Sequence, residues 1–192
     1  MTLPITISNK ELARFTAVNW PATHVITALD PGDRLWTPSN IKPANHLQIN
    51  FADEEHPKLA FAPTRDHVSR ILSWSAGLNP DKDRLLVHCQ AGISRSTAIA
   101  SAIWIQHNGR DWEGLFSWLM ADRPAASPNI LISIFADDHL GLQGNLIQMM
   151  ADIRETNFRH KFGFGSDKVT SIDNLRRDIA RSEEQQKRMR LV

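Results

Sequence analysis

The chain contains a single cysteine, Cys89, and it lies in a stretch whose residue types could bind and attack a phosphate ester. An apolar segment, 85–89, leads through a loop with Gly92 to a segment rich in Ala and Ile that begins near Arg95. A loop at a helix N-terminus presents backbone N–H groups, and the helix dipole adds partial positive charge. This field favours a bound phosphate dianion and the thiolate form of a cysteine. Cys89 is therefore a candidate nucleophile.

Two further residues of the stretch support phosphate binding. Gly92 would let the backbone turn and come close to the anion. Arg95 offers a planar guanidinium that can bind two phosphate oxygens at once. The predicted phosphate-binding loop consists of Gln90, Ala91, Gly92, Ile93, Ser94 and Arg95. The alternative is that Cys89 is simply a small buried residue at the end of a core strand.

The segment His88-Cys89-x5-Arg95-Ser96 resembles the H-C-x5-R-[S/T] signature of the protein tyrosine phosphatase superfamily, and the size resembles its compact dual-specificity group. The resemblance implies that Cys89 attacks phosphorus while Arg95 and the loop backbone hold the equatorial oxygens. Because these groups supply the charge, no metal or other cofactor is expected. The resemblance also implies that His88 stabilises the loop and the thiolate. Ser96 would aid the second step, in which the thiolate leaves phosphocysteine.

Cleavage of a phosphate ester also needs a proton for the departing oxygen, and a carboxylic acid can supply it. In the resembling family an Asp does this from a loop after a strand, a few tens of residues before the Cys. Asp53, in the acidic loop 52–57, fits best. The competing carboxylates are Glu54, Glu55, Asp66 and Asp33. The plainer alternative is that the acidic loop is only a solvated connection.

Hydrophobic patterning predicts the elements that would position these residues. Strands are expected at 3–8, 24–29, 46–51 and 84–88, and helices at 9–15, 64–76, 94–107, 111–121, 130–140 and 145–159. Thr64 is the expected N-cap of the helix 64–76, whose expected buried face consists of Val68, Ile71, Leu72 and Ser75. The expected buried face of the helix 111–121 consists of Trp112, Leu115, Phe116, Leu119 and Met120. This order predicts an α/β fold with a mostly parallel sheet of four or five strands and helices on both faces. The phosphate-binding loop would join a central strand to a helix.

Two other segments have alternative interpretations. The loop 30–44 leaves the end of a predicted parallel strand, so it either lines the ligand crevice or only connects two elements. The dipeptides Arg-Pro and Pro-Asn within 123–129 also resemble the dual-specificity group. Asn129 could therefore support the phosphate-binding loop. Alternatively, Ser127 or Asn129 only caps the helix 130–140, which is the interpretation we favour.

The rest of the composition limits the remaining function classes. A net charge of +1 gives no general case for binding nucleic acid or a membrane surface. We predict no signal peptide and no membrane span, and the single cysteine argues for a reducing, cytoplasmic location. We expect a cysteine-phosphatase domain over 1–165. Residues 166–192 form a polar extension that could be helical, with an apolar line of Val169, Ile172, Leu175 and Ile179.

The sequence thus favours a cysteine-dependent protein phosphatase of phosphotyrosine or dual specificity. Its partners would be phosphorylated proteins or small phosphomonoesters, and the oligomeric state stays open. The alternatives are a phosphatase for phosphoinositides or other small molecules, a rhodanese-type sulfurtransferase, and a non-catalytic phosphate-binding module. His88, Arg95 and Asp53 favour phosphatase over sulfurtransferase. The lack of lysine at Gln90 and Ile93 mildly favours phosphoprotein substrates.

Overall fold

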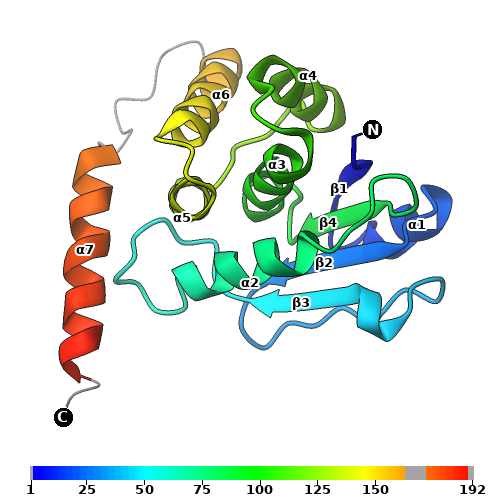
Figure 1. Cartoon of the computed structure of the whole chain (residues 1–192), viewed down its shortest axis with the longest axis horizontal. Coiled ribbons are helices and arrows are strands. Elements are labelled where there is room, and N and C mark those ends of the chain that lie inside the picture. The colour runs from blue at the N-terminus through cyan, green and yellow to red at the C-terminus, as the bar shows by residue number, and fades with distance from the viewer. Residues whose placement is uncertain (1, 163–171, 190–192) are drawn as a thin grey trace.

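In the computed structural model, which describes residues 2–162 and 172–189, four strands pair into one parallel sheet (Figure 1). They are β1 (Ile5–Asn9), β2 (His24–Leu29), β3 (His46–Asn50) and β4 (Leu85–Cys89), in the order β1-β4-β2-β3. The predicted α/β class and parallel sheet are confirmed. Because β4 lies between β1 and β2, the strand that ends in Cys89 is an interior strand.

The strands are apolar on both faces because both faces are covered. All five residues of β4 are buried. Ile26 and Val87 face the main core, whereas Val25 and Leu86 belong to a second, smaller cluster on the other face. A near-continuous apolar run is typical of a parallel strand with both faces covered. The central strand is therefore held rigidly from both sides.

Helices form the covering layers on the two faces. The helices are α1 (Ala13–Asn19), α2 (Arg65–Ser75), α3 (Arg95–Asn108), α4 (Trp112–Asp122), α5 (Ile130–Leu140), α6 (Asn145–Phe162) and α7 (Ile172–Met189), with a 3-10 turn at Pro43–Asn45. Buried residues of α1 pack in the two smaller clusters, and those of α2 to α7 belong to the main core. None of the helices in the described ranges is long and apolar enough to span a bilayer.

Most predicted elements are confirmed, and the face predicted for 64–76 is buried as expected with Thr64 as its N-cap. The helix predicted at 9–15 is displaced, because Asn9 still pairs with Cys89 in the sheet and α1 begins only at Ala13. In α4, Leu115 is buried, but Phe116 is 43% exposed. The reason is that Phe116 faces an open groove of about 450 Å³ between α4 and α6.

The predicted apolar line of the C-terminal extension is partly confirmed. Leu175 and Ile179 are buried in α7, and Ile172 is half-buried against the main core. Val169 lies outside the described residues. The residues of α7 that face away from this line are polar and mostly exposed, which is why the segment as a whole is hydrophilic. The domain boundary expected near 165 stays a prediction.

Candidate active site

Residues that follow or end the four parallel strands meet at one edge of the sheet, and Cys89 and Asp53 are the predicted site residues among them. Cys89 is the last residue of β4, Lys10 follows β1, Asp30 follows β2, and Asp53 comes shortly after β3. The carboxyl ends of parallel strands lie at the same edge of a sheet, which is where ligands bind in open α/β folds. The loop that begins at Asp30 therefore starts at the site, which favours the pocket-lining interpretation of its first residues.

The loop between β4 and α3 requires glycine at one position. Gly92 has a φ of +72°, in the left-handed region that favours glycine. A Cβ atom there would lie 2.8 Å from the backbone carbon and oxygen of Ser8. The loop is also tied to the end of β1, because the Lys10 N–H donates to the Gln90 carbonyl at 3.1 Å. The loop thus packs directly on β1.

The sulfur of Cys89 lies among hydrogen-bond donors at the start of α3. Its Sγ is 3.3 Å from the Gly92 N–H nitrogen and 3.1 Å from the Ser96 Oγ. Ser94 occupies the N-cap position but forms no side-chain cap on the helix. Donors of this kind stabilise a thiolate, and an uncapped helix N-terminus attracts an anion. Cys89 itself is only 1% exposed.

The six residues predicted to bind phosphate, 90–95, differ in their exposure to solvent. Gln90, Ala91 and Ile93 are exposed, Ser94 is half-buried, and Gly92 and Arg95 are buried. The exposed members can thus be reached by a substrate while the buried ones keep the loop in shape.

Arg95 is buried with two carboxylates beside it. Its Nη1 donates to the Asp30 Oδ1 at 3.0 Å and to the Phe51 carbonyl at 2.7 Å. Its Nε lies 3.9 Å from the Asp53 Oδ2 and has no hydrogen-bond partner in the described part of the chain. Nη1 therefore fixes the guanidinium, and Nε stays available to an anion.

Sequence analysis does not single out Asp30 as a site residue, because it places residue 30 only in the loop 30–44. The available signal was its place immediately after a predicted parallel strand. In the structure its carboxylate holds Nη1 of Arg95 at 3.0 Å. Asp30 is thus an orienting partner of the predicted phosphate-binding arginine.

Asp53, the predicted general acid, lies at the mouth of the loop. Its Oδ1 accepts hydrogen bonds from the Ser94 Oγ at 2.7 Å and from the Asn129 Nδ2 at 2.9 Å. The side chain is 38% exposed, so a substrate oxygen can approach it. Asn129 also caps α5 through the Ile132 N–H at 3.0 Å. The structure contains the cap that we favour, and it also contains a contact with the phosphate-binding loop, in which the Asn129 N–H donates to the Ser94 carbonyl at 3.4 Å.

Two of the competing carboxylates, Glu55 and Asp33, are engaged elsewhere. Glu55 accepts from the Ile130 N–H at the start of α5 and pairs with Arg154 of α6. Asp33 pairs with Lys10 at 2.8 Å, and Asp66 lies in the first turn of α2. Glu54 uses its backbone carbonyl to accept from Asn129. Asp53 is therefore the carboxylate of this group that lies against both Ser94 and Arg95.

His88 lies at one end of a chain of hydrogen bonds beneath the site. Its Nε2 is 2.7 Å from the Thr27 Oγ1, which is in turn 2.7 Å from the His46 Nε2. Burial lowers the pKa of His88 to about 4, although the backbone of Cys89 opposes this shift. The ring is therefore neutral at neutral pH, which suits a supporting role.

Among the described residues, no three His, Cys, Asp or Glu side chains converge as metal ligands would.

The site thus combines a parallel sheet, a cysteine at the end of its interior strand, and an arginine at the start of the next helix. Human dual specificity protein phosphatase 15 is 29% identical over 107 residues, which cover 56% of this chain and 33% of that protein. Human dual specificity protein phosphatase 18 is 24% identical over 125 residues, or 59% of this chain and 63% of that protein. No family model matches the chain.

Solved structures agree on the fold. The crystal structure of DUSP15 superposes with a TM-score of 0.57 at 22% identity and covers 79% of this chain and 94% of that chain. The chain is therefore similar in sequence to the dual-specificity phosphatases of the protein tyrosine phosphatase superfamily and shares their fold. It spans about a third of the length of human dual specificity protein phosphatase 15. This distant relationship supports a phosphatase.

Proposed function

We propose that this chain hydrolyses phosphomonoesters on proteins through a phosphocysteine intermediate, with phosphotyrosine or dual specificity. The observation that carries this proposal is the surroundings of Cys89. Its sulfur lies 3.1 Å from a hydroxyl and 3.3 Å from a backbone N–H at the start of a 14-residue helix. A buried arginine, whose Nε has no hydrogen-bond partner among the described residues, belongs to the same loop. This combination supports a nucleophilic thiolate next to an anion site.

In the first step, the Cys89 thiolate attacks phosphorus and the bond from phosphorus to the leaving oxygen breaks. Arg95 and the N–H groups of residues 90–95 hold the other phosphate oxygens, so that the developing charge meets fixed donors. Asp53 gives its proton to the leaving oxygen as that oxygen takes up the electron pair. The hydrogen bonds from Ser94 and Asn129 orient the Asp53 carboxyl toward the mouth of the loop.

In the second step, a water molecule hydrolyses phosphocysteine. The Asp53 carboxylate accepts a proton from the water, whose oxygen attacks phosphorus, and the phosphorus–sulfur bond breaks. The electron pair of that bond returns to Cys89 as a thiolate. Ser96 and the Gly92 N–H stabilise this leaving thiolate from 3.1 and 3.3 Å. The products are inorganic phosphate and the starting enzyme.

A phosphoprotein is the substrate class that the loop supports best. Residues 90–94 contain no lysine or arginine, so Arg95 is the cation of the loop itself. A head group with several phosphates would call for further cations there. The similar proteins are named dual specificity protein phosphatases, and that name describes them as acting on proteins. We therefore assign phosphorylated proteins ahead of phosphoinositides.

The test is hydrolysis of p-nitrophenyl phosphate against pH, with reductant and a metal chelator present. We expect activity in the wild type and none in Cys89→Ser. Asp53→Asn should lose the basic limb of the profile, and it should be slower by a factor near the lower end of the roughly 10²–10⁴ that a general acid contributes, because p-nitrophenol is a good leaving group. Asp66→Asn, which removes a carboxylate from the nearby first turn of α2, is the matched control and should behave as wild type.

Other outcomes would point to other functions. A wild type without turnover under these conditions would contradict the enzyme proposal. Turnover of thiosulfate in its place would support a rhodanese-type sulfurtransferase, and phosphopeptide binding without turnover would support a binding module. A panel of phosphotyrosine, phosphoserine and phosphothreonine peptides, with phosphoinositides alongside, then identifies the substrate class by kcat/KM.

A further inference from the structure

The C-terminal helix α7 lies against the loop that carries Asp53. We call residues 52–61 the acid loop because they carry Asp53. The two ends of this loop are joined by a hydrogen bond of 2.8 Å from the Ala52 N–H to the Phe61 carbonyl. The loop extends from the end of β3 toward α7, which stands at the edge of the fold beyond α2 (Figure 1). A segment more than a hundred residues downstream therefore borders the candidate active site.

Three consecutive residues at the tip of the acid loop contact one face of α7. Asp178 lies 3.4 Å from the Lys58 Nζ and 3.7 Å from the His56 Nε2. One helical turn further on, the Ser182 Oγ donates to the Pro57 carbonyl at 3.5 Å. Residues four apart share a helix face, so these contacts form one continuous patch.

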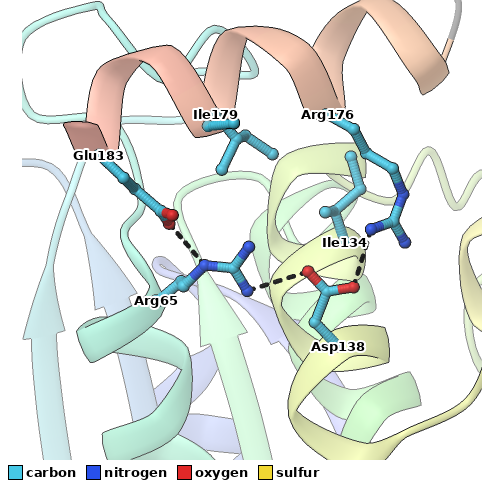
Figure 2. Close-up of a pocket in the computed structure, with 7 residues that line it drawn as sticks. Arg65, Ile134, Asp138, Arg176, Ile179 and Glu183 are labelled. Carbon is cyan, nitrogen blue, oxygen red and sulfur yellow. Dashed lines mark hydrogen bonds and ion pairs between the residues drawn. The ribbon is translucent and has the colours of Figure 1, made fainter. Parts of the chain in front are cut away.

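The helix α7 is itself anchored to the body beside this patch. Leu175 and Ile179 are 4% and 3% exposed within the main core. Arg65, which begins α2 just after the acid loop, bridges Glu183 at 2.5 Å and Asp138 at 2.9 Å (Figure 2).

The interface is nevertheless less tightly packed than the core. Arg176 of α7 also reaches Asp138, at 2.9 Å (Figure 2). A cavity of about 70 Å³ remains between these ion pairs and the apolar residues Ile134 and Ile179. Exposed ion pairs are individually weak and are screened by salt. Docking of α7 therefore depends on several contacts acting together.

We propose that α7 is a positioning element for the general acid, with Asp178 and Ser182 as its positioning residues. Docked α7 holds the tip of the acid loop and so keeps Asp53 at its hydrogen bonds with Ser94 and Asn129. A general acid is effective only within hydrogen-bond reach of the leaving oxygen. Fixing the tip also removes conformational freedom that the loop would otherwise have. This inference rests on the proposed role of Asp53.

The experiment compares two substitutions with the same charge change on α7. Asp178→Lys places a cation opposite Lys58 and His56. Glu184→Lys, the matched control, removes a carboxylate that pairs with Arg188 within the helix and contacts neither residue. Both variants are made in the full chain and compared with wild type on two substrates. p-Nitrophenyl phosphate has a good leaving group, whereas phenyl phosphate has a poor one that depends on the acid.

We expect Asp178→Lys to lower kcat on phenyl phosphate about tenfold or more and kcat on p-nitrophenyl phosphate by less than about threefold. Glu184→Lys should keep the wild-type ratio of kcat on phenyl phosphate to kcat on p-nitrophenyl phosphate. High salt should move the wild type toward the Asp178→Lys ratio. In hydrogen exchange, residues 52–61 should exchange faster in Asp178→Lys, while β4 stays protected. Ile179→Ala, which loosens the buried anchor, should produce the same pattern.

The comparison with Asp53→Asn separates the two proposals. One outcome is that Asp53→Asn lowers the ratio of kcat on phenyl phosphate to kcat on p-nitrophenyl phosphate, whereas Asp178→Lys leaves it at the wild-type value. This outcome would overturn the role of α7 and support Asp53 as the general acid. If Asp53→Asn itself leaves the ratio unchanged, Asp53 is not the acid and both proposals fail. If Asp178→Lys and Glu184→Lys change the ratio equally, the effect is one of charge alone and the positioning role is overturned.

Discussion

At the residue scale, the hydroxyl of Ser96 is the group whose removal separates the two chemical steps. It lies 3.1 Å from the sulfur of Cys89 and is fully buried. A hydrogen bond to a charged group contributes about 1.5–3 kcal/mol, which corresponds to roughly 10- to 100-fold in rate. In Ser96→Ala we expect phosphorylation of Cys89 to continue while hydrolysis of phosphocysteine slows by that factor.

Stopped-flow measurement with p-nitrophenyl phosphate checks this expectation. Ser96→Ala should release a burst of p-nitrophenol equal to the enzyme concentration, followed by slow turnover. Thr97→Ser, which keeps a hydroxyl at the neighbouring position, serves as the control. Uniform slowing of the burst and the steady state would mean that Ser96 acts mainly on the attacking thiolate.

Asn129 offers a second separation at this scale, between catalysis and stability. Asn129→Ser keeps a good N-cap for α5 but is too short to reproduce the 2.9 Å hydrogen bond to Asp53. We expect kcat on phenyl phosphate to fall by about tenfold, while the lost hydrogen bonds to Asp53 and the Glu54 carbonyl lower the free energy of unfolding by about 1–2 kcal/mol. Asn129→Ala should add about 1 kcal/mol of destabilisation from the lost cap, measured by urea unfolding. Equal activity in Asn129→Ser and the wild type would contradict a role in orienting Asp53.

At the scale of elements, the loop between β4 and α3 depends on its contact with β1. A Cβ at Gly92 would lie 2.8 Å from the Ser8 backbone, and the φ of +72° adds strain for any other residue. Gly92→Ala should therefore destabilise the fold by about 2–4 kcal/mol and reduce activity by more than about 100-fold.

The control for this prediction is Gly141→Ala at the end of α5. Gly141 lies in the left-handed region with a φ of +63°, but nothing lies within 4 Å of the position that a Cβ would take. Backbone strain alone should cost about 1 kcal/mol there and leave activity intact. Urea unfolding and p-nitrophenyl phosphate hydrolysis measure both variants. Equal effects on stability would mean that the contact with β1 yields easily.

At the scale of the whole molecule, the buried His88 couples stability to pH. Burial lowers its pKa to about 4 in the folded protein, against about 6.5 in the unfolded chain. The folded state thus favours the neutral ring. This contribution is fully present above about pH 6.5 and is lost as the pH falls toward about 4, for a total of about 3 kcal/mol.

His88→Gln tests this pH dependence, because glutamine can still hydrogen-bond Thr27 but does not titrate. Denaturant unfolding at neutral pH and near pH 4.5 measures the loss in each protein. We expect the wild type to lose more stability than His88→Gln between the two conditions. An equal loss would assign the acid sensitivity to other groups, such as His46, whose pKa burial also lowers.

Local patterning determined the parallel α/β class, most element positions and the candidate nucleophile. The spacing of apolar residues and the capping of helix ends act over a few residues, so the helix from Arg65 and its Thr64 cap can be predicted from the sequence. The spacing of Cys89 and Arg95 is equally local, since one loop carries both. The exception at α1 has a long-range cause, because the pairing of Asn9 with Cys89 of β4 delays the helix start.

Only the tertiary structure decided which distant groups surround that loop. Asp30 binds Arg95 across 65 positions, and Asn129 reaches Asp53 across 76. Contact between α7 and the acid loop spans 120 positions. Such contacts depend on strand order and helix packing, which the pattern of a single segment does not encode. The sequence alone therefore determined the candidate nucleophile and anion loop, and the fold determined the groups that orient them.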